Sequence, residues 1–103
     1  MKPWYSPESL SDVKRIIDYI KNDLQNPSAA DTVAKRIMHS CSLLKEMPYM
    51  GISLSSRIEV GPDWYYLITG NYIVFYRLET SAVHIIRILD TRTDYINVIR
   101  EFL

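Results

Sequence analysis

The first half of the chain carries apolar residues at helical spacing. Ser6, Pro7 and Glu8 are typical of a helix N-cap, first position and positive dipole end, and apolar side chains then recur every three or four residues. The expected core face of this helix is Leu10, Val13, Ile16, Ile17, Ile20 and Leu24. The expected solvent face is Asp12, Lys14, Arg15, Asp18 and Lys21.

A second helix is predicted directly after Asn26. Pro27 disfavours the helical conformation at the residue before it, but it can itself open a new helix. The connection is only a few residues long, so the two helices are expected to form an antiparallel hairpin. The predicted apolar face of the second helix is Ala30, Val33, Ala34, Ile37, Cys41 and Leu44.

The second half of the chain changes to strand-like patterning. Residues 64–68, 72–78 and 83–89 are rich in aromatic and β-branched side chains, and Gly70 with Asn71 is a two-residue hairpin signal. Residues 2–5 and 57–60 are expected as short strands, and residues 94–103 as a closing helix. The prediction is one α+β domain, residues 1–103, with an N-terminal helical hairpin packed on a C-terminal antiparallel sheet.

Hairpin geometry predicts which sheet residues share a face. A two-residue loop pairs Tyr65 with Tyr76, and a four-residue loop at 79–82 pairs Tyr76 with Ile85 and Val74 with Arg87. The face expected to receive the helices is Tyr66, Ile68, Ile73, Phe75, Ile86 and Ile88. The opposite face is then an aromatic platform with a cation in it, formed by Tyr65, Tyr72, Tyr76 and Arg87.

This arginine–tyrosine face supports two interpretations. Arginine clamps phosphate, and tyrosine stacks on bases or passes protons, which would make it a nucleic-acid platform. Alternatively, the tyrosines are cross-strand pairs that stabilise the sheet, and Arg87 is a surface ion-pair partner. Lys+Arg and Asp+Glu each total 12, and this neutrality argues against a generic nucleic-acid binder.

Other chemistry finds little support in the sequence. His39 and His84 have no metal-ligand spacing, three glycines include no phosphate-binding loop, and no cofactor is expected. The single cysteine, Cys41, excludes an internal disulfide and is expected as a core thiol. No apolar run is long enough to span a membrane, and no signal peptide is expected at the N-terminus, so the predicted location is the cytoplasm.

Five segments in order resemble the RelE/ParE superfamily, the toxin halves of bacterial type II toxin–antitoxin modules. The resemblance covers nearly the whole chain. It is carried by YSPE at 5–8, NPSAA at 26–30, LKEMPYMG at 44–51, GNYIVFYR at 70–77 and IIRILDTRTDY at 85–95.

The resemblance implies a cognate antitoxin that wraps and neutralises the toxin, as one long amphipathic peptide over an exposed apolar groove. RelE-like members cut mRNA in the ribosomal A site, whereas ParE-like members poison DNA gyrase. In the RelE-like branch, arginines on the sheet and a C-terminal tyrosine orient the RNA. Carried over by position, the catalytic residues are Arg87, Arg92 and Tyr95. The RNA-binding platform would be Tyr65, Tyr72 and Tyr76, which the strand pairing places on one face.

Two departures leave the target open. Many relatives carry an arginine where this chain has Tyr65, and RelE-like nucleases tend to be strongly basic, whereas this chain is neutral. The first hypothesis is a toxin that inhibits translation by ribosome-dependent mRNA cleavage. The alternatives are a gyrase poison without enzymatic activity and an antitoxin-binding relative that has lost toxicity.

Overall fold

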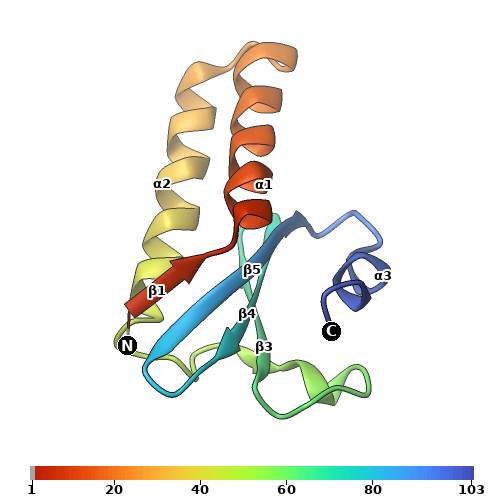
Figure 1. Cartoon of the computed structure of the whole chain (residues 1–103). Coiled ribbons are helices and arrows are strands. Elements are labelled where there is room, and N and C mark those ends of the chain that lie inside the picture. The colour runs from red at the N-terminus through yellow and green to blue at the C-terminus, as the bar shows by residue number, and fades with distance from the viewer. Residues whose placement is uncertain (1) are drawn as a thin grey trace.

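The computed structural model describes residues 2–103, so residue 1 of the predicted domain lies outside it. A helical hairpin comes first, and most of the sheet follows it (Figure 1). The five strands lie in the order β1-β5-β4-β3-β2, and only the β1–β5 pair is parallel. The elements are β1 (Lys2–Tyr5), α1 (Pro7–Asp18), η1 (Tyr19–Asp23), α2 (Pro27–Leu43), β2 (Ile52–Ser53), η2 (Leu54–Ser56), β3 (Trp64–Thr69), β4 (Tyr72–Leu78), β5 (Ala82–Asp90) and α3 (Tyr95–Arg100).

Both predicted helix starts are confirmed by their caps. The Ser6 hydroxyl accepts a hydrogen bond from the backbone N–H of Ser9 (2.9 Å), and the Asn26 side chain accepts one from that of Ala29 (3.1 Å). The first helix continues into a wider π-helical turn, η1, and Gln25 reverses the chain with a φ of 52°. The two helices then run side by side, and the tip of their hairpin projects beyond the sheet (Figure 1).

The predicted sheet register is confirmed up to one β-bulge. Tyr65 pairs with Tyr76 and Tyr76 with Ile85, and Gly70 turns the hairpin with a φ of 61°. The predicted pairing of Val74 with Arg87 is wrong, because Val74 pairs with Ile88. An extra residue, Ile86, is inserted in β5 at this point, so every later residue is shifted by one.

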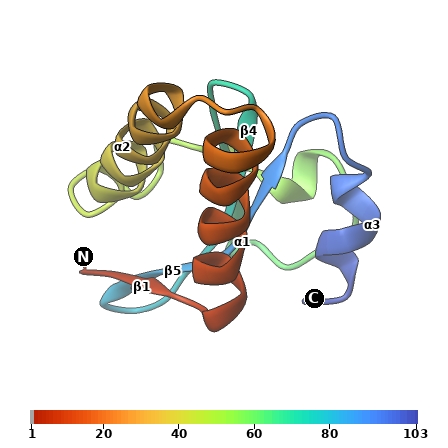
Figure 2. The same cartoon turned by 90° about the horizontal axis from the view of Figure 1, so that it is seen from above.

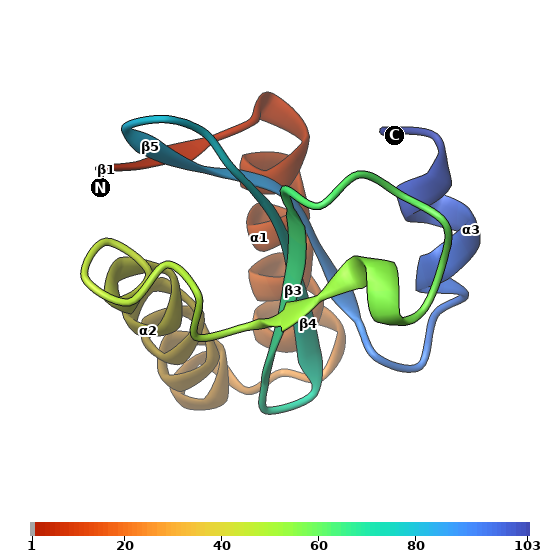
Figure 3. The ribbon, with the colours of Figure 1, turned by 90° about the horizontal axis from the view of Figure 1, so that it is seen from below.

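The predicted sidedness of the sheet is also wrong. The face that carries Tyr65, Tyr72 and Tyr76 packs against the helical hairpin, in a core with Ile37 and Cys41 of α2. The face that was expected to receive the hairpin packs instead against α3 and the segment after β2. Figures 2 and 3 show α2 and α3 on opposite sides of the sheet. This second core contains Leu54, Trp64, Tyr66, Ile73, Phe75, Ile86, Leu89 and Ile99.

The reason is that both faces are apolar enough to be buried. Tyrosine rings supply large hydrophobic area, so the side with the tyrosines is as suitable for a helix as the aliphatic side. Alternation along the strands therefore separates the faces but does not say which one receives the hairpin. Of the residues placed on the helix-facing side, Ile88 does face the hairpin, because the bulge moves it there, and Ile68 is exposed.

Some of the remaining predictions are confirmed and one is wrong. The closing helix is confirmed as α3, and Cys41 is a fully buried core thiol whose pKa burial raises to about 11. The strand predicted at 57–60 is wrong, since the short strand lies earlier, at Ile52–Ser53, and residues 57–60 form a loop. Within residues 2–103, no helix is both long enough and apolar enough to cross a membrane.

Candidate functional site

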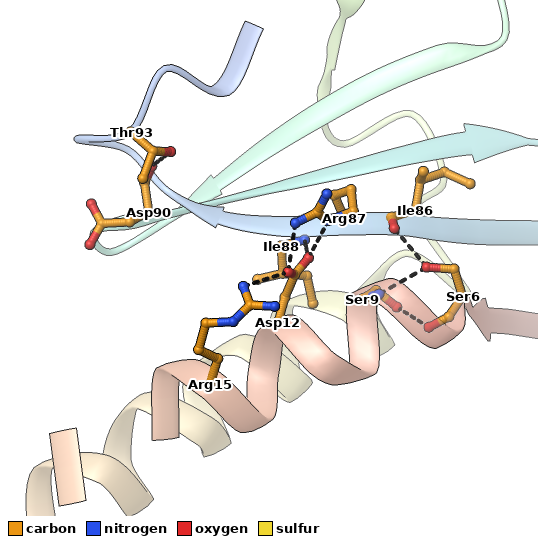
Figure 4. Close-up of polar contacts among 9 residues, drawn as sticks. All are labelled: Ser6, Ser9, Asp12, Arg15, Ile86, Arg87, Ile88, Asp90 and Thr93. Atoms are coloured by element: carbon orange, nitrogen blue, oxygen red, sulfur yellow. Dashed lines mark hydrogen bonds and ion pairs between the residues drawn. The ribbon is translucent and has the colours of Figure 1, made fainter. Parts of the chain in front are cut away.

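Arg87 is engaged by a buried carboxylate from the first helix. Its Nε donates to one oxygen of Asp12 (2.7 Å) and its terminal nitrogen to the other (2.8 Å), as Figure 4 shows. The Asp12 side chain is only 1% exposed, although the sequence places it on the solvent face of α1. This bidentate hydrogen bond raises the pKa of the Arg87 guanidinium.

Asp12 also stabilises the bulge in β5. It accepts hydrogen bonds from the backbone N–H of Ile88 (2.9 Å) and from Arg15 (3.2 Å), so one carboxylate holds three donor groups. The hydroxyl of Ser6 donates to the carbonyl of the bulged Ile86 (2.6 Å) (Figure 4). Asp12, on the predicted solvent face of α1, therefore binds β5, which the amphipathic pattern alone does not indicate.

Arg92 lies in the turn after β5 and points into solvent. Its side chain is 80% exposed, and it pairs with Asp90 through two contacts of 3.0 and 2.7 Å. The same carboxylate accepts the backbone N–H of Arg92 (2.8 Å), and this arginine lowers the pKa of Asp90. Arg92 thus has the accessibility that Arg87 lacks.

Tyr95 begins α3 on the opposite face of the sheet from the helical hairpin. Its ring packs against Phe75 with centroids 6.0 Å apart, and its hydroxyl lies 3.5 Å from a guanidinium nitrogen of Arg57. Across residues 2–103, no hydrogen bond, ion pair or ring contact joins any two of Arg87, Arg92 and Tyr95. Their catalytic roles stay a prediction, and the structure does not bring them into mutual contact.

The predicted tyrosine platform lies against the helices rather than open to solvent. Tyr76 is fully buried, donates to the Pro48 carbonyl (2.9 Å) and accepts from the Gly51 N–H (3.0 Å). Its burial raises its pKa to about 12. Tyr65 stacks on Tyr76 with ring centroids 5.6 Å apart. The structure therefore supports the cross-strand interpretation for this pair.

Tyr72, the third platform residue, borders a groove whose position the sequence does not indicate. The groove has a volume of about 640 Å³ and runs between the outer part of the helical hairpin and the ends of β4 and β5. The larger aliphatic side chains that line it are Ile16, Ile20, Leu24, Val33, Ile88 and Leu89. Arg15, Arg36 and Arg92 are its cations, while Asp12 and Asp90 already hold two of these arginines.

Two exposed apolar side chains, one in η1 and one directly after it, are the sequence signal that could have indicated this groove. Leu24 is assigned by periodicity to the core face, but it lies beyond the sheet and is 56% exposed. Tyr19 is exposed at the same end. Apolar residues near the tip of a hairpin that outreaches its sheet have nothing within the chain to cover them, and clusters of this kind mark interaction sites.

Comparison with known proteins places this fold in a family. Residues 5–95 match the family model for the ParE toxin of the type II toxin–antitoxin system parDE. A solved structure titled "Chromosomal ParDE TA system from P. aeruginosa" aligns with a TM-score of 0.72 at 18% identity, covering 87% of this chain and 95% of that one. No curated protein matches the chain.

A second solved structure shows that the fold is also similar to that of a RelE toxin. The RelB–RelE antitoxin–toxin complex from Methanococcus jannaschii aligns with a TM-score of 0.57 at 16% identity, covering 91% of this chain and 96% of that one. The family model spans most of this chain, from the end of β1 to the start of α3. The chain therefore belongs to the ParE toxin family of type II toxin–antitoxin systems, within the RelE/ParE superfamily.

Proposed function

We propose that this toxin acts in the cytoplasm by binding DNA gyrase, as ParE-like toxins do, and not by cutting mRNA. The observation that carries the proposal is the engagement of Arg87 by Asp12. In the RNA-cutting branch the matching arginine orients the RNA. In this chain the same position holds α1 against β5, with its donors directed at a buried carboxylate.

The energetic argument is that a phosphate must displace Asp12 before it can use Arg87. Separating a buried ion pair so that one charge is left unpaired costs about 3–5 kcal/mol. The formal net charge of zero gives no long-range attraction for a polyanion to offset that cost. Tyr65 at the position of a family arginine removes a further cation. A protein target places none of these demands on the chain.

The test is a supercoiling assay with purified gyrase and the purified chain. We expect inhibition together with trapped cleavage complexes, and growth arrest when the chain is expressed without an antitoxin. A parallel primer-extension assay on translated mRNA is expected to show no codon-linked cuts. Cuts with unaffected gyrase would establish the nuclease instead, and normal growth with unaffected gyrase would establish a relative without toxicity.

We also propose that a cognate antitoxin covers the groove between the hairpin and the sheet with an amphipathic helix. The groove has an apolar lining with arginines among its residues, which suits a helix with one apolar and one acidic face. Arg36 supports this assignment, because within residues 2–103 it has no ion pair and is available to an acidic side chain.

A pair of matched variants tests the groove. Leu24→Glu places a charge among the apolar groove residues, whereas Leu10→Glu places one at a similarly exposed leucine that does not line it (56% and 52% exposed). In copurification with the cognate antitoxin, we expect Leu24→Glu to weaken the complex at least tenfold and Leu10→Glu to leave it intact. Equal effects of the two changes would contradict the assignment.

A further inference from the structure

A second arginine–tyrosine cluster lies on the face of the sheet that carries α3. Arg57 follows η2, and its two terminal nitrogens lie 3.5 Å from the hydroxyls of Tyr66 on β3 and Tyr95 on α3. Its guanidinium carbon lies 5.9 Å from the centre of the Tyr66 ring. Three separate elements thus bring one cation and two phenol groups together. Contacts of 3.5 Å are at the outer limit of hydrogen bonding, so the guanidinium is held weakly.

Arg57 differs from most arginines of this protein in its lack of a counterion among residues 2–103. In the part of the chain that the structure describes, no carboxylate forms an ion pair with Arg57. Arg77 provides the comparison. It lies at a similar distance over an aromatic ring, 5.8 Å from the centre of Trp64, but it also pairs with Glu79 at 2.9 Å. Of these two cation–aromatic contacts, only the one at Arg57 lacks an internal anion.

The unused hydrogen-bonding capacity of this cluster consists largely of donors. Each tyrosine hydroxyl accepts from Arg57, and neither donates to any other group between residues 2 and 103, so each retains its O–H. Arginine has five N–H donors and no acceptor, and only two of them are directed at the tyrosines. A cluster with a positive charge and free donors suits a ligand group that is negative and only accepts.

We propose that Arg57, Tyr66 and Tyr95 form a binding site for the carboxylate side chain of a protein partner. A carboxylate accepts two parallel N–H bonds from one guanidinium, and the hydroxyl of Tyr95 adds a third donor. A nucleic-acid surface relies on several cations along the backbone, whereas this cluster has one, in a chain of zero net charge. The site does not depend on gyrase being the target, because its chemistry is the same for any acidic protein segment.

The test is an NMR titration of the full chain with a blocked Gly-Glu-Gly peptide. We expect saturable shifts of the Arg57 side-chain signals and of the Tyr66 and Tyr95 rings. The corresponding Gly-Gln-Gly peptide is expected to produce none. Arg57→Gln should abolish the response, and Arg77→Gln, which removes the arginine already paired with Glu79, should leave it unchanged. Tyr95→Phe keeps the ring and should weaken binding several-fold.

Two results would overturn the proposal. Shifts of the same signals by a short single-stranded RNA at lower concentration than the peptide would assign the cluster to phosphate. Absence of saturable shifts, or shifts that persist in Arg57→Gln, would show that the cluster binds no carboxylate. Arg57 is exposed on a loop, so the spectrum of the variant away from the cluster is expected to match the original and to report an intact fold.

Discussion

The arginines and tyrosines of the sheet region differ in whether the rest of the chain already binds them. Arg87, which pairs with Phe75 and lies 5.2 Å from the centre of the Phe102 ring, is held by Asp12 of α1. Tyr76, on the face with the helical hairpin, donates to the Pro48 carbonyl and accepts from the Gly51 N–H. Arg57 lies over the Tyr66 ring on the face with α3, and among residues 2–103 no carboxylate forms an ion pair with it. Arginine and tyrosine therefore act as structural residues where another part of the chain supplies a hydrogen-bond partner, as Glu79 also does for Arg77. They remain available for ligands where no such partner is present.

The largest loss of stability is expected when the carboxylate that holds Arg87 is removed. Asp12→Ala leaves a largely buried guanidinium and the Ile88 N–H without their acceptor, so we expect a loss of about 3–5 kcal/mol in the free energy of unfolding. The measurement is urea denaturation. Asp18→Ala, which removes the exposed partner of Lys14 on the same helix, should cost less than about 1 kcal/mol.

A double variant shows whether the cost comes from the unpaired charge. In Asp12→Ala combined with Arg87→Met, no buried cation remains, and we expect part of the lost stability to return. A loss equal to the sum of the two single changes would mean that Asp12 and Arg87 act independently.

An intermediate effect is expected at Gly51, where the backbone lies close to the sheet. A Cβ added at Gly51 would lie 2.5 Å from both the Tyr66 carbonyl and the Tyr76 hydroxyl, so Gly51→Ala should destabilise by about 1–3 kcal/mol. Gly61 lies in the loop on the α3 side, and its added Cβ would meet no atom within 4 Å. Gly61→Ala should therefore change stability by less than about 1 kcal/mol when both variants are measured by urea denaturation.

The smallest of the three effects tests the Tyr76 hydroxyl. Tyr76→Phe leaves the Pro48 carbonyl and the Gly51 N–H without their partner and should cost about 1–2 kcal/mol. Tyr95→Phe loses only one contact of 3.5 Å, so we expect a smaller change. If the two variants were equally destabilised, Tyr76 could not be called a structural residue in contrast to Tyr95.

The pH dependence of stability gives a second measure of the same hydroxyl. Its pKa in the folded chain is about 12, above the ordinary value of 10.0, so the unfolded chain releases this proton first. The stability that this hydroxyl contributes is fully present below pH 10 and is lost as the pH rises towards 12. Tyr76→Phe should remove part of this loss, while Tyr5, whose pKa is also raised to about 12, retains another part.

Much of the fold follows from local signals in the sequence. The caps at Ser6 and Asn26 mark both helix starts, and Gly70 with Asn71 sets the β3–β4 register. These features depend on residues a few positions apart, and their geometry is nearly independent of the rest of the chain. The segments that identify the superfamily lie at the same local features, which is why the family could be inferred before the structure.

The tertiary structure decided how the sheet is covered and what its arginines do. The bulge at Ile86 depends on Ser6, 80 residues earlier, and the position of Arg87 depends on Asp12, 75 residues earlier. Hydrophobic alternation contains no information about such distant polar partners. It also cannot choose between two faces that are both apolar. The sequence by itself determined most of the elements, the β3–β4 pairing and the family, whereas only packing determined that Arg87 is held and Arg57 is left available.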